Sequence, residues 1–164
     1  MSSKSKPFIK WVGGKTQLIK DIEKVLPENF AEIKNVTYIE PFVGGGAVLF
    51  WIMQKFPNIT KAVINDINPD LTMAYKAIKE TPIELVNYLK DIQSEYLPLN
   101  EEKRKEYYLH KREKFNTKSL DFIENTALFI FLNRTCFNGL YRVNSKGLFN
   151  VPFGRYTNPK ICDE

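Results

Sequence analysis

The chain has 164 residues, a net charge of +5, 43% hydrophobic residues and 26% charged residues. This length suits one domain, or one domain with a small lobe, and this balance of residues excludes disordered and collagen-like proteins. The longest apolar runs fall far short of the roughly 20 residues that cross a bilayer, so we expect no membrane partner.

The first 68 residues alternate between predicted strands and helices. Three consecutive glycines, 44–46, separate the first strand from the helix that follows it. A strand, a glycine turn, a helix and a second strand in this order indicate a parallel α/β sheet. We therefore expect a partial α/β domain over residues 7–68. Its predicted elements are a helix over 15–26, a strand over 36–41, a helix over 47–55 and a strand over 61–65.

After residue 68 the pattern changes to consecutive helices. Two of them begin with a capping residue followed by proline, a typical helix start. Further on, two short apolar strands flank the turn 144–147, which ends in glycine and predicts a β-hairpin. We expect a helical lobe over 69–164 that carries this hairpin at about 140–151. The predicted helices cover 68–80, 82–97, 100–115 and 119–132.

Most of the surplus positive charge lies in residues 133–160. This segment contains five basic residues and no acidic residue. Aromatic and asparagine side chains alternate with the bases, a mixture that suits phosphate contacts combined with base-edge contacts or stacking. A solvated basic loop without a partner fits this composition equally well. The five basic residues are Arg134, Arg142, Lys146, Arg155 and Lys160.

The segment 40–48 has the sequence EPFVGGGAV. A strand that ends in an acid and continues through glycines into a helix lets a ligand approach the backbone closely. A Rossmann dinucleotide site needs another glycine at position 49, where this chain has Leu49. A P-loop with Gly14 as its second glycine needs its first at position 9, where this chain has Ile9. A nucleoside without a pyrophosphate, such as S-adenosylmethionine, therefore fits this turn better than a nicotinamide or flavin dinucleotide.

Asp66 ends the second predicted strand, about 20 residues after Gly46. At this spacing a carboxylate accepts hydrogen bonds from the ribose hydroxyls of a bound nucleoside. Capping of the next helix is the alternative role for Asp66. Near the N-terminus, Trp11 and Lys15 flank a Gly-Gly turn, a place suited to contacts with adenine and with a carboxylate. A position in the core is the alternative for Trp11.

The cysteine and histidine content argues against a metal site. Cys136, Cys162 and His110 are scattered along the chain, whereas structural zinc needs four ligands at close spacing. Two cysteines in a chain without a recognisable secretion signal fit a reducing compartment. We therefore expect no metal and a cytoplasmic protein.

Five segments, taken in order, resemble the DNA adenine methylase family, the α-group of S-adenosylmethionine-dependent N6-adenine DNA methyltransferases. The segments 8–15, 40–46 and 64–68 resemble its methionine-binding, glycine and ribose motifs. The segments 137–144 and 149–156 resemble its target-recognition hairpin, and the similarity runs from about residue 7 to the last residue. The five sequences are FIKWVGGK, EPFVGGG, INDIN, FNGLYRVN and FNVPFGRY.

The resemblance implies a Rossmann-like domain that binds S-adenosylmethionine as methyl donor, without a metal. It also implies double-stranded DNA as substrate, methylated at N6 of adenine within GATC, as in restriction–modification and strand-marking systems. The residues implied to bind the cofactor are Trp11, Lys15, Glu40, Phe42, Gly44, Gly46 and Asp66.

The resemblance further implies how the hairpin contacts DNA. Arg142 would donate to guanine O6 and N7, Phe137 would enter the base stack, and Asn138 would face the base left unpaired by flipping. Others would contact phosphates or the thymine methyl group. The residues implied to contact DNA are Lys10, Arg134, Phe137, Asn138, Leu140, Arg142, Asn144, Pro152 and Arg155.

The catalytic tetrapeptide of the family, Asp-Pro-Pro-Tyr or a close variant, follows the hairpin in its members, and these 164 residues contain no Asp-Pro-Pro. We therefore expect an N-terminal fragment of a longer enzyme, without catalytic residues of its own and inactive alone. A DNA-binding remnant or one subunit of a split enzyme is the alternative, and a small nucleotide-binding protein without a DNA role is a third. The partners implied are a cognate restriction endonuclease and at most a second copy, as a monomer or weak dimer.

Overall fold

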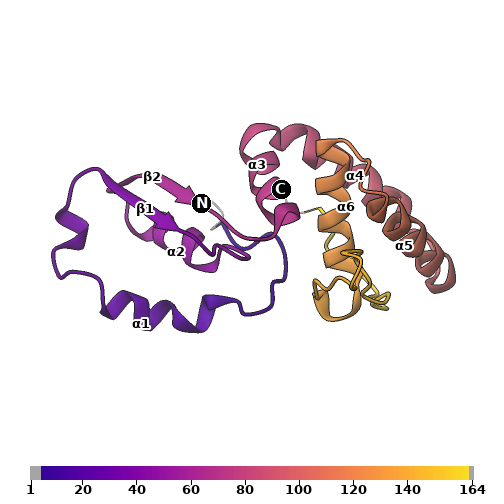
Figure 1. Ribbon diagram of the computed structural model, residues 1–164, viewed down its shortest axis with the longest axis horizontal. Coiled ribbons are helices and arrows are strands. Elements are labelled where there is room, and N and C mark those ends of the chain that lie inside the picture. The colour runs from indigo at the N-terminus through magenta and orange to yellow at the C-terminus, as the bar shows by residue number, and fades with distance from the viewer. Residues whose placement is uncertain (1–4, 163–164) are drawn as a thin grey trace. The chain divides into compact units, whose positions relative to one another are not determined.

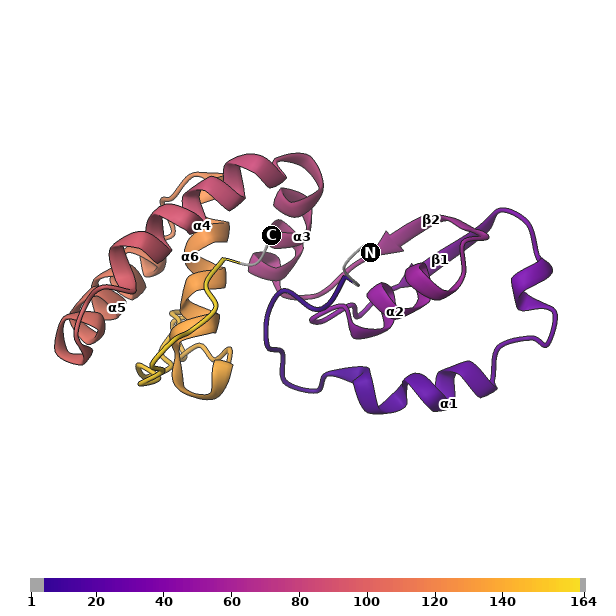
Figure 2. The ribbon, with the colours of Figure 1, turned by 180° about the vertical axis from the view of Figure 1, so that it is seen from behind.

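A computed structural model describes residues 5–162, which form two compact units (Figure 1, Figure 2). The first unit comprises residues 5–8 and 13–68, and the second comprises residues 9–12 and 69–162. The segment 9–12 thus belongs to the second unit, although the chain on both sides of it belongs to the first. Six α-helices and one two-stranded parallel sheet, counted over residues 5–162, make this a mixed α/β protein.

The first unit is built on two parallel strands, as the sequence predicts. β1 (Val36–Glu40) pairs along its length with β2 (Ile59–Ile64), and α2 (Ala47–Lys55) connects them (Figure 1). Valine, isoleucine, threonine and tyrosine predominate in both strands, residues that suit a pleated, half-buried surface. The side chains that α2 buries are Val48, Leu49 and Ile52.

The helix predicted over 15–26 is confirmed only in part. A 3₁₀ helix covers Lys15–Leu18, and α1 covers only Ile19–Lys24. No side chain caps either of these two helices, and neither contains a buried residue. Helices this short depend on tertiary packing, and here a cavity of about 310 Å³ lies among α1, β1 and α2. The predicted α-helix is therefore longer than the observed one.

In the second unit, three helices pack against α6 (Phe122–Thr135). Ten of the 14 residues of α6 are buried, so it is the core helix and not a surface helix with one apolar face. Within residues 5–162, no helix is both long and apolar enough to cross a membrane. The other elements are α3 (Pro69–Glu80), α4 (Pro82–Tyr96), α5 (Glu101–Asn116) and a 3₁₀ turn (Phe137–Gly139).

Asparagine and aspartate caps set the starts of α5 and α6. Asn100 Oδ1 accepts a hydrogen bond from Lys103 N–H at 3.0 Å, as the predicted start of α5 implies. The helix predicted from residue 119 begins later, because Asp121 Oδ1 accepts from Glu124 N–H at 2.9 Å and forms the N-cap. The predicted type of element is therefore right, and its predicted start is three residues too early.

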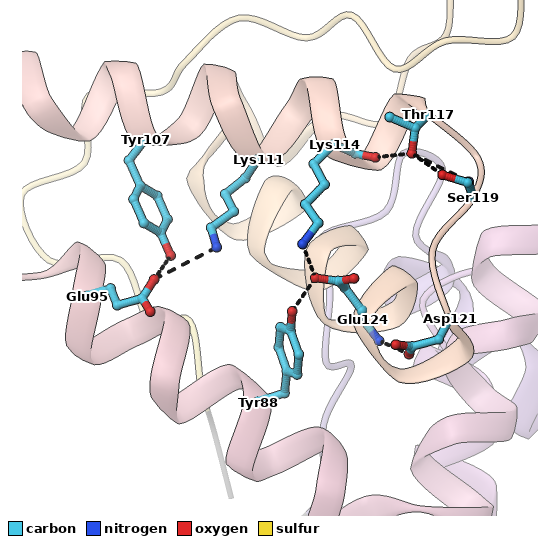
Figure 3. Close-up of polar contacts among 9 residues, drawn as sticks. All are labelled: Tyr88, Glu95, Tyr107, Lys111, Lys114, Thr117, Ser119, Asp121 and Glu124. Atoms are coloured by element: carbon cyan, nitrogen blue, oxygen red, sulfur yellow. Dashed lines mark hydrogen bonds and ion pairs between the residues drawn. The ribbon is translucent and has the colours of Figure 1, made fainter.

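Two glutamates connect α5 to its neighbouring helices (Figure 3). Glu95 of α4 accepts a hydrogen bond from Tyr107 Oη at 2.5 Å. Glu124 of α6 accepts one from Lys114 Nζ at 2.5 Å and another from Tyr88. These two bonds, the one from Lys114 above all, lower the pKa of the Glu124 carboxyl below its ordinary value. Such partly exposed contacts orient the helices more than they stabilise them.

Over residues 140–151, where a hairpin is predicted, an isolated bridge takes the place of longer paired strands. Val143 and Phe149 form an isolated antiparallel bridge, and Asn150 N–H donates to the Arg142 carbonyl at 3.1 Å. Gly147 ends the turn with φ of +73°, a conformation that glycine adopts without strain. An isolated bridge of this kind needs support from the helices around it.

The buried thiol of Cys136 provides a test of this core. Its Sγ donates to the Leu140 carbonyl at 3.2 Å, and burial raises the pKa of the thiol to about 11. Because the thiolate is the reactive form, we expect Cys136 to resist iodoacetamide at pH 8 until the protein is unfolded. Peptide mass spectrometry measures this, with half-buried Cys162 as the internal comparison that reacts first. Equal alkylation of the two thiols in the folded protein would contradict the burial of Cys136.

Candidate functional site

The carboxyl ends of β1 and β2 form the first candidate site. Asn65 N–H donates to the Glu40 carbonyl, and Val43 N–H donates to the Asn65 carbonyl, both at 2.9 Å. These bonds extend the strand pairing and bring the glycine turn after β1 beside Asp66 after β2. Ligands of parallel α/β sheets bind at this edge.

Asp66 connects the two loops at this edge. Its Oδ2 accepts from Gly44 N–H and its Oδ1 from Asn68 N–H, each at 3.0 Å. Gly44 and Gly46 have φ of +54° and +83°, which glycine adopts at little cost. Asp66 thus accepts from the N–H group just before α3, as expected for helix capping, the alternative role of this residue. These bonds use two of the about four lone-pair sites of a carboxylate, so two remain for a ligand.

Lys15 and Glu40 form an ion pair beside the glycine turn. Lys15 Nζ lies 2.9 Å from Glu40 Oε1 and also donates to the Phe42 carbonyl. Glu40 is 6% exposed, and its other oxygen accepts from Tyr38 Oη at 2.7 Å. Burial, together with this bond, raises the pKa of Tyr38 above its ordinary value. Both Glu40 oxygens are engaged by the protein, so the partly exposed Lys15 ammonium is the group within reach of an anion.

Two exposed apolar side chains follow the strands at the same edge. Phe42 after β1 is 71% exposed, and Ile67 after β2 is 92% exposed. Single exposed apolar residues are common, but these two adjoin the loops that Asp66 connects, where a flat base could pack. The sequence reasoning named Phe42 as a cofactor-binding residue, which stays a prediction, and did not single out Ile67. Across residues 5–162, no three histidine, cysteine or acidic side chains are grouped to hold a metal ion.

Trp11, predicted for the cofactor site, belongs to the second unit. Its ring centroid lies 5.3 Å from that of Tyr141 and 6.2 Å from that of Phe129. Tyr141 Oη in turn donates to Asp70 Oδ2 at 2.8 Å. This cluster attaches the first hairpin strand to α3 and α6 and accounts for a packing role of Trp11. Its contact with adenine stays a prediction.

Asn133 of α6 holds the segment 9–12 in the second unit. Asn133 is 1% exposed, and its Oδ1 accepts from Lys10 N–H at 2.9 Å. Its Nδ2 donates to the carbonyls of Lys10 at 2.8 Å and Gly139 at 3.0 Å. The sequence reasoning missed this contact, because no local pattern shows that residues 123 positions apart meet.

The 3₁₀ turn after α6 presents two predicted DNA-binding residues to solvent. Phe137 is 52% exposed, and exposed Asn138 has φ of +55°. Phe137 N–H donates to the Pro152 carbonyl at 2.8 Å, which fixes the turn to the chain that follows the hairpin. A Cβ at Gly154 would lie 2.4 Å from the Cys136 carbonyl oxygen, so the chain can come this close to Cys136 only because residue 154 is glycine.

One face of α5 holds the chain after the hairpin turn. Arg104, Tyr108, Arg112 and Asn116 donate to backbone carbonyls within residues 149–157, at 2.8 to 3.2 Å. Their spacing of four places them on one face of the helix. Because Arg104 bonds the end of this segment and Asn116 its beginning, the segment runs antiparallel to α5. The sequence had indicated only a charged helix.

The other predicted DNA-binding residues differ in their surroundings. Asn144 Oδ1 accepts from the Lys146 and Leu148 N–H groups at 2.9 and 3.1 Å, so this oxygen closes the hairpin turn. Exposure separates the rest. Arg142, Pro152 and Arg155 are exposed, as is Lys10, whereas Arg134 and Leu140 are half-buried.

Two features define the class of protein. Acids and a glycine turn at the ends of parallel strands are typical of α/β enzymes that bind a nucleoside cofactor. A hairpin rich in basic and aromatic residues is typical of proteins that act on nucleic acid. Over residues 11–164 the chain matches the D12 class N6 adenine-specific DNA methyltransferases. The chain belongs to that family, and the resemblance noted in the sequence is confirmed.

Curated relatives agree with this assignment. A type II methyltransferase, M.MjaIII of Methanocaldococcus jannaschii, is 53% identical over 161 residues, which cover 97% of this chain and 55% of that protein. M1.LlaDCHI of Lactococcus lactis is 41% identical over 97% of this chain and 51% of its own length. A DNA adenine methylase of Vibrio cholerae is 40% identical over 98% and 52%. The chain spans about half the length of these relatives.

The ion pair beside the glycine turn predicts a defined stability change. Lys15→Met leaves the Glu40 carboxylate buried without its cation, so we expect the free energy of unfolding to fall by about 1–3 kcal/mol. Adding Glu40→Gln removes the stranded charge, and the double variant should recover part of this loss. Urea unfolding of the single and double variants measures both effects. Equal stability of Lys15→Met and the parent protein would contradict the pairing.

The three hydrogen bonds of Asn133 predict a larger effect. Asn133→Ala leaves the Lys10 and Gly139 backbone groups unpaired in the interior, so we expect a loss of about 3 kcal/mol in the free energy of unfolding. Hydrogen exchange at the Lys10 amide should accelerate with it. Asn158→Ala, at an exposed position, is the matched control and should change neither quantity. Unchanged protection of the Lys10 amide in Asn133→Ala would contradict the contact.

Proposed function

We propose that the gene product containing this chain transfers a methyl group from S-adenosylmethionine to N6 of adenine in duplex DNA. The hydrogen bond from Gly44 N–H to Asp66, at 3.0 Å, carries the proposal. It holds the glycine turn and the acid together at the sheet edge where a nucleoside binds. The family and the names of the relatives, DNA adenine methylase and type II methyltransferase, support the reaction.

The residues at this edge fit the methyl donor. S-adenosylmethionine supplies a methyl group activated on a sulfonium, and the protein supplies alignment. Asp66 would accept hydrogen bonds from the ribose hydroxyls, and the Lys15 ammonium would bind the carboxylate. Phe42 and Ile67 would cover the adenine, and Glu40 would act by holding Lys15. We propose that β1, α2 and β2 belong to a Rossmann-like domain.

The second unit would read and open the DNA. Inside a stacked duplex the adenine amino group is out of reach of the methyl donor, so the base has to be flipped out. Phe137, exposed on an anchored turn, would occupy the gap, and Asn138 would face the base left behind. Arg142 would read guanine, which makes GATC the proposed site. The phosphate contacts are assigned to Lys10, Arg134 and Arg155, and the thymine methyl contacts to Leu140 and Pro152.

The cellular setting follows from the same proposal. Relatives named as type II methyltransferases support a cognate restriction endonuclease as a functional partner. We also propose a cytoplasmic location. We propose a monomer or weak dimer, because one hairpin suffices to read the DNA around one flipped adenine.

Methylation is tested with the natural gene product, S-adenosylmethionine and a duplex that contains one GATC. We expect N6-methyladenine in the digested DNA, measured by nucleoside mass spectrometry, and none in a duplex without the site. Asp66→Ala should abolish the product while its unfolding transition remains cooperative. DNA binding without any methylated adenine would overturn the proposal in favour of a DNA-binding remnant or one half of a split enzyme.

Arg142 provides the specificity test. Arg142→Ala removes a bidentate contact with guanine, so discrimination against a duplex with a substituted guanine should fall by about 1–3 kcal/mol. The measurement is the ratio of kcat/KM on the two duplexes for each protein. If the parent protein methylates both duplexes equally, Arg142 does not read guanine.

A further inference from the structure

Arg142 is held by a single residue on the opposite strand of the hairpin. Its Nε donates to Asn150 Oδ1 at 2.8 Å, and its Nη2 donates to the Asn150 carbonyl at 3.2 Å. The Asn150 N–H donates back to the Arg142 carbonyl at 3.1 Å. Arg142 is exposed, so these bonds orient a side chain that would otherwise sample many rotamers.

Asn150 itself is fixed from both sides. Its neighbours Phe149 and Val151 are 2% and 1% exposed. Asn116 of α5 bonds both backbone groups of Phe149, accepting from its N–H at 2.8 Å and donating to its carbonyl at 2.9 Å. Tyr108 Oη donates to the Val151 carbonyl at 2.8 Å. The acceptors that hold the guanidinium are therefore anchored to the helical unit.

The contacts also determine which edge of the guanidinium is left for a partner. A guanidinium has five N–H donors in a rigid plane. Asn150 takes the one on Nε and one of the two on Nη2. Both Nη1 donors and the second Nη2 donor lie outside the pair with Asn150, and the Nη1–Nη2 edge matches the two acceptors of guanine, O6 and N7.

We propose that Asn150 is a positioning residue that sets guanine specificity by presenting the Nη1–Nη2 edge of Arg142 to the major groove. The inference rests on the proposed function, because it assumes that Arg142 reads guanine. Asn150 acts through Arg142 and needs no contact of its own with DNA. The gain comes from a side chain ordered before binding, which lowers the entropy lost in the complex.

The test compares binding of the gene product to two duplexes, one with GATC and one in which 7-deazaguanine replaces its guanine and so lacks N7. Fluorescence anisotropy gives the two dissociation constants without depending on methyl transfer. The parent protein should bind the modified duplex about tenfold more weakly. Asn150→Ala should reduce this ratio to about twofold, with an unfolding midpoint close to that of the parent. Ser145→Ala, at an exposed position of the same hairpin, should keep the parent ratio.

Two further variants separate positioning from direct contact. Asn150→Asp keeps an acceptor for Nε, so its ratio should stay near the parent value although its charge weakens binding to both duplexes. In an Arg142→Ala background, Asn150→Ala should have no further effect on either dissociation constant. A further loss of affinity in that background would show that Asn150 contacts DNA itself and would overturn the inference. A parent protein that binds both duplexes equally would overturn the guanine-reading role of Arg142, and this inference with it.

Discussion

The second unit depends on the hydrogen bonds of Asn133, the more deeply buried of two amides in the core helix α6. An amide in such an interior costs free energy unless its donors and acceptor are bonded. Lys10 and Gly139 provide those bonds. The requirement therefore fixes two pieces of chain at once, the segment that precedes the Gly-Gly turn and the turn that carries Phe137. The buried amide of Asn133 thus holds in place the turn that exposes the Phe137 side chain.

The acids at the ends of β1 and β2 differ in their burial and in their hydrogen-bond donors. Glu40 is buried, with one oxygen on Lys15 and the other on Tyr38. Asp66 is half-buried, and the two hydrogen bonds that it accepts come from backbone N–H groups, so part of its accepting capacity is left. One carboxylate therefore organises the cation and the glycine turn, and the other remains available to a ligand. Burial and the kind of donor, not residue type, separate the two roles.

Sequence patterns predicted the elements wherever the cause was local. The helix near Asn100, the strands around the glycine turn and the turn at 144–147 each depend on neighbouring residues, and each was predicted. The helix after Gly14 was overestimated because its stability depends on packing that only the fold determines. The contacts of Asn133 and Asn150 were missed for a related reason, since the groups they bond are distant in sequence or face them across a hairpin. Asp66 was found because its spacing from the glycines is itself a pattern, although its bond to Gly44 was not.

The hairpin owes its order to the helices and not to its own strands. An isolated antiparallel bridge is marginal in water, yet one strand is bonded to α5 through residues such as Asn116 and the other to α3 through Tyr141 and Asp70. Each side of the hairpin is hydrogen-bonded to a different helix. The turn and the outward side chains are therefore the parts of the hairpin left to meet a partner. In the proposed function, discrimination between DNA sequences would therefore be built into α5 as much as into Arg142, because the helix face determines where the guanidinium points before DNA arrives.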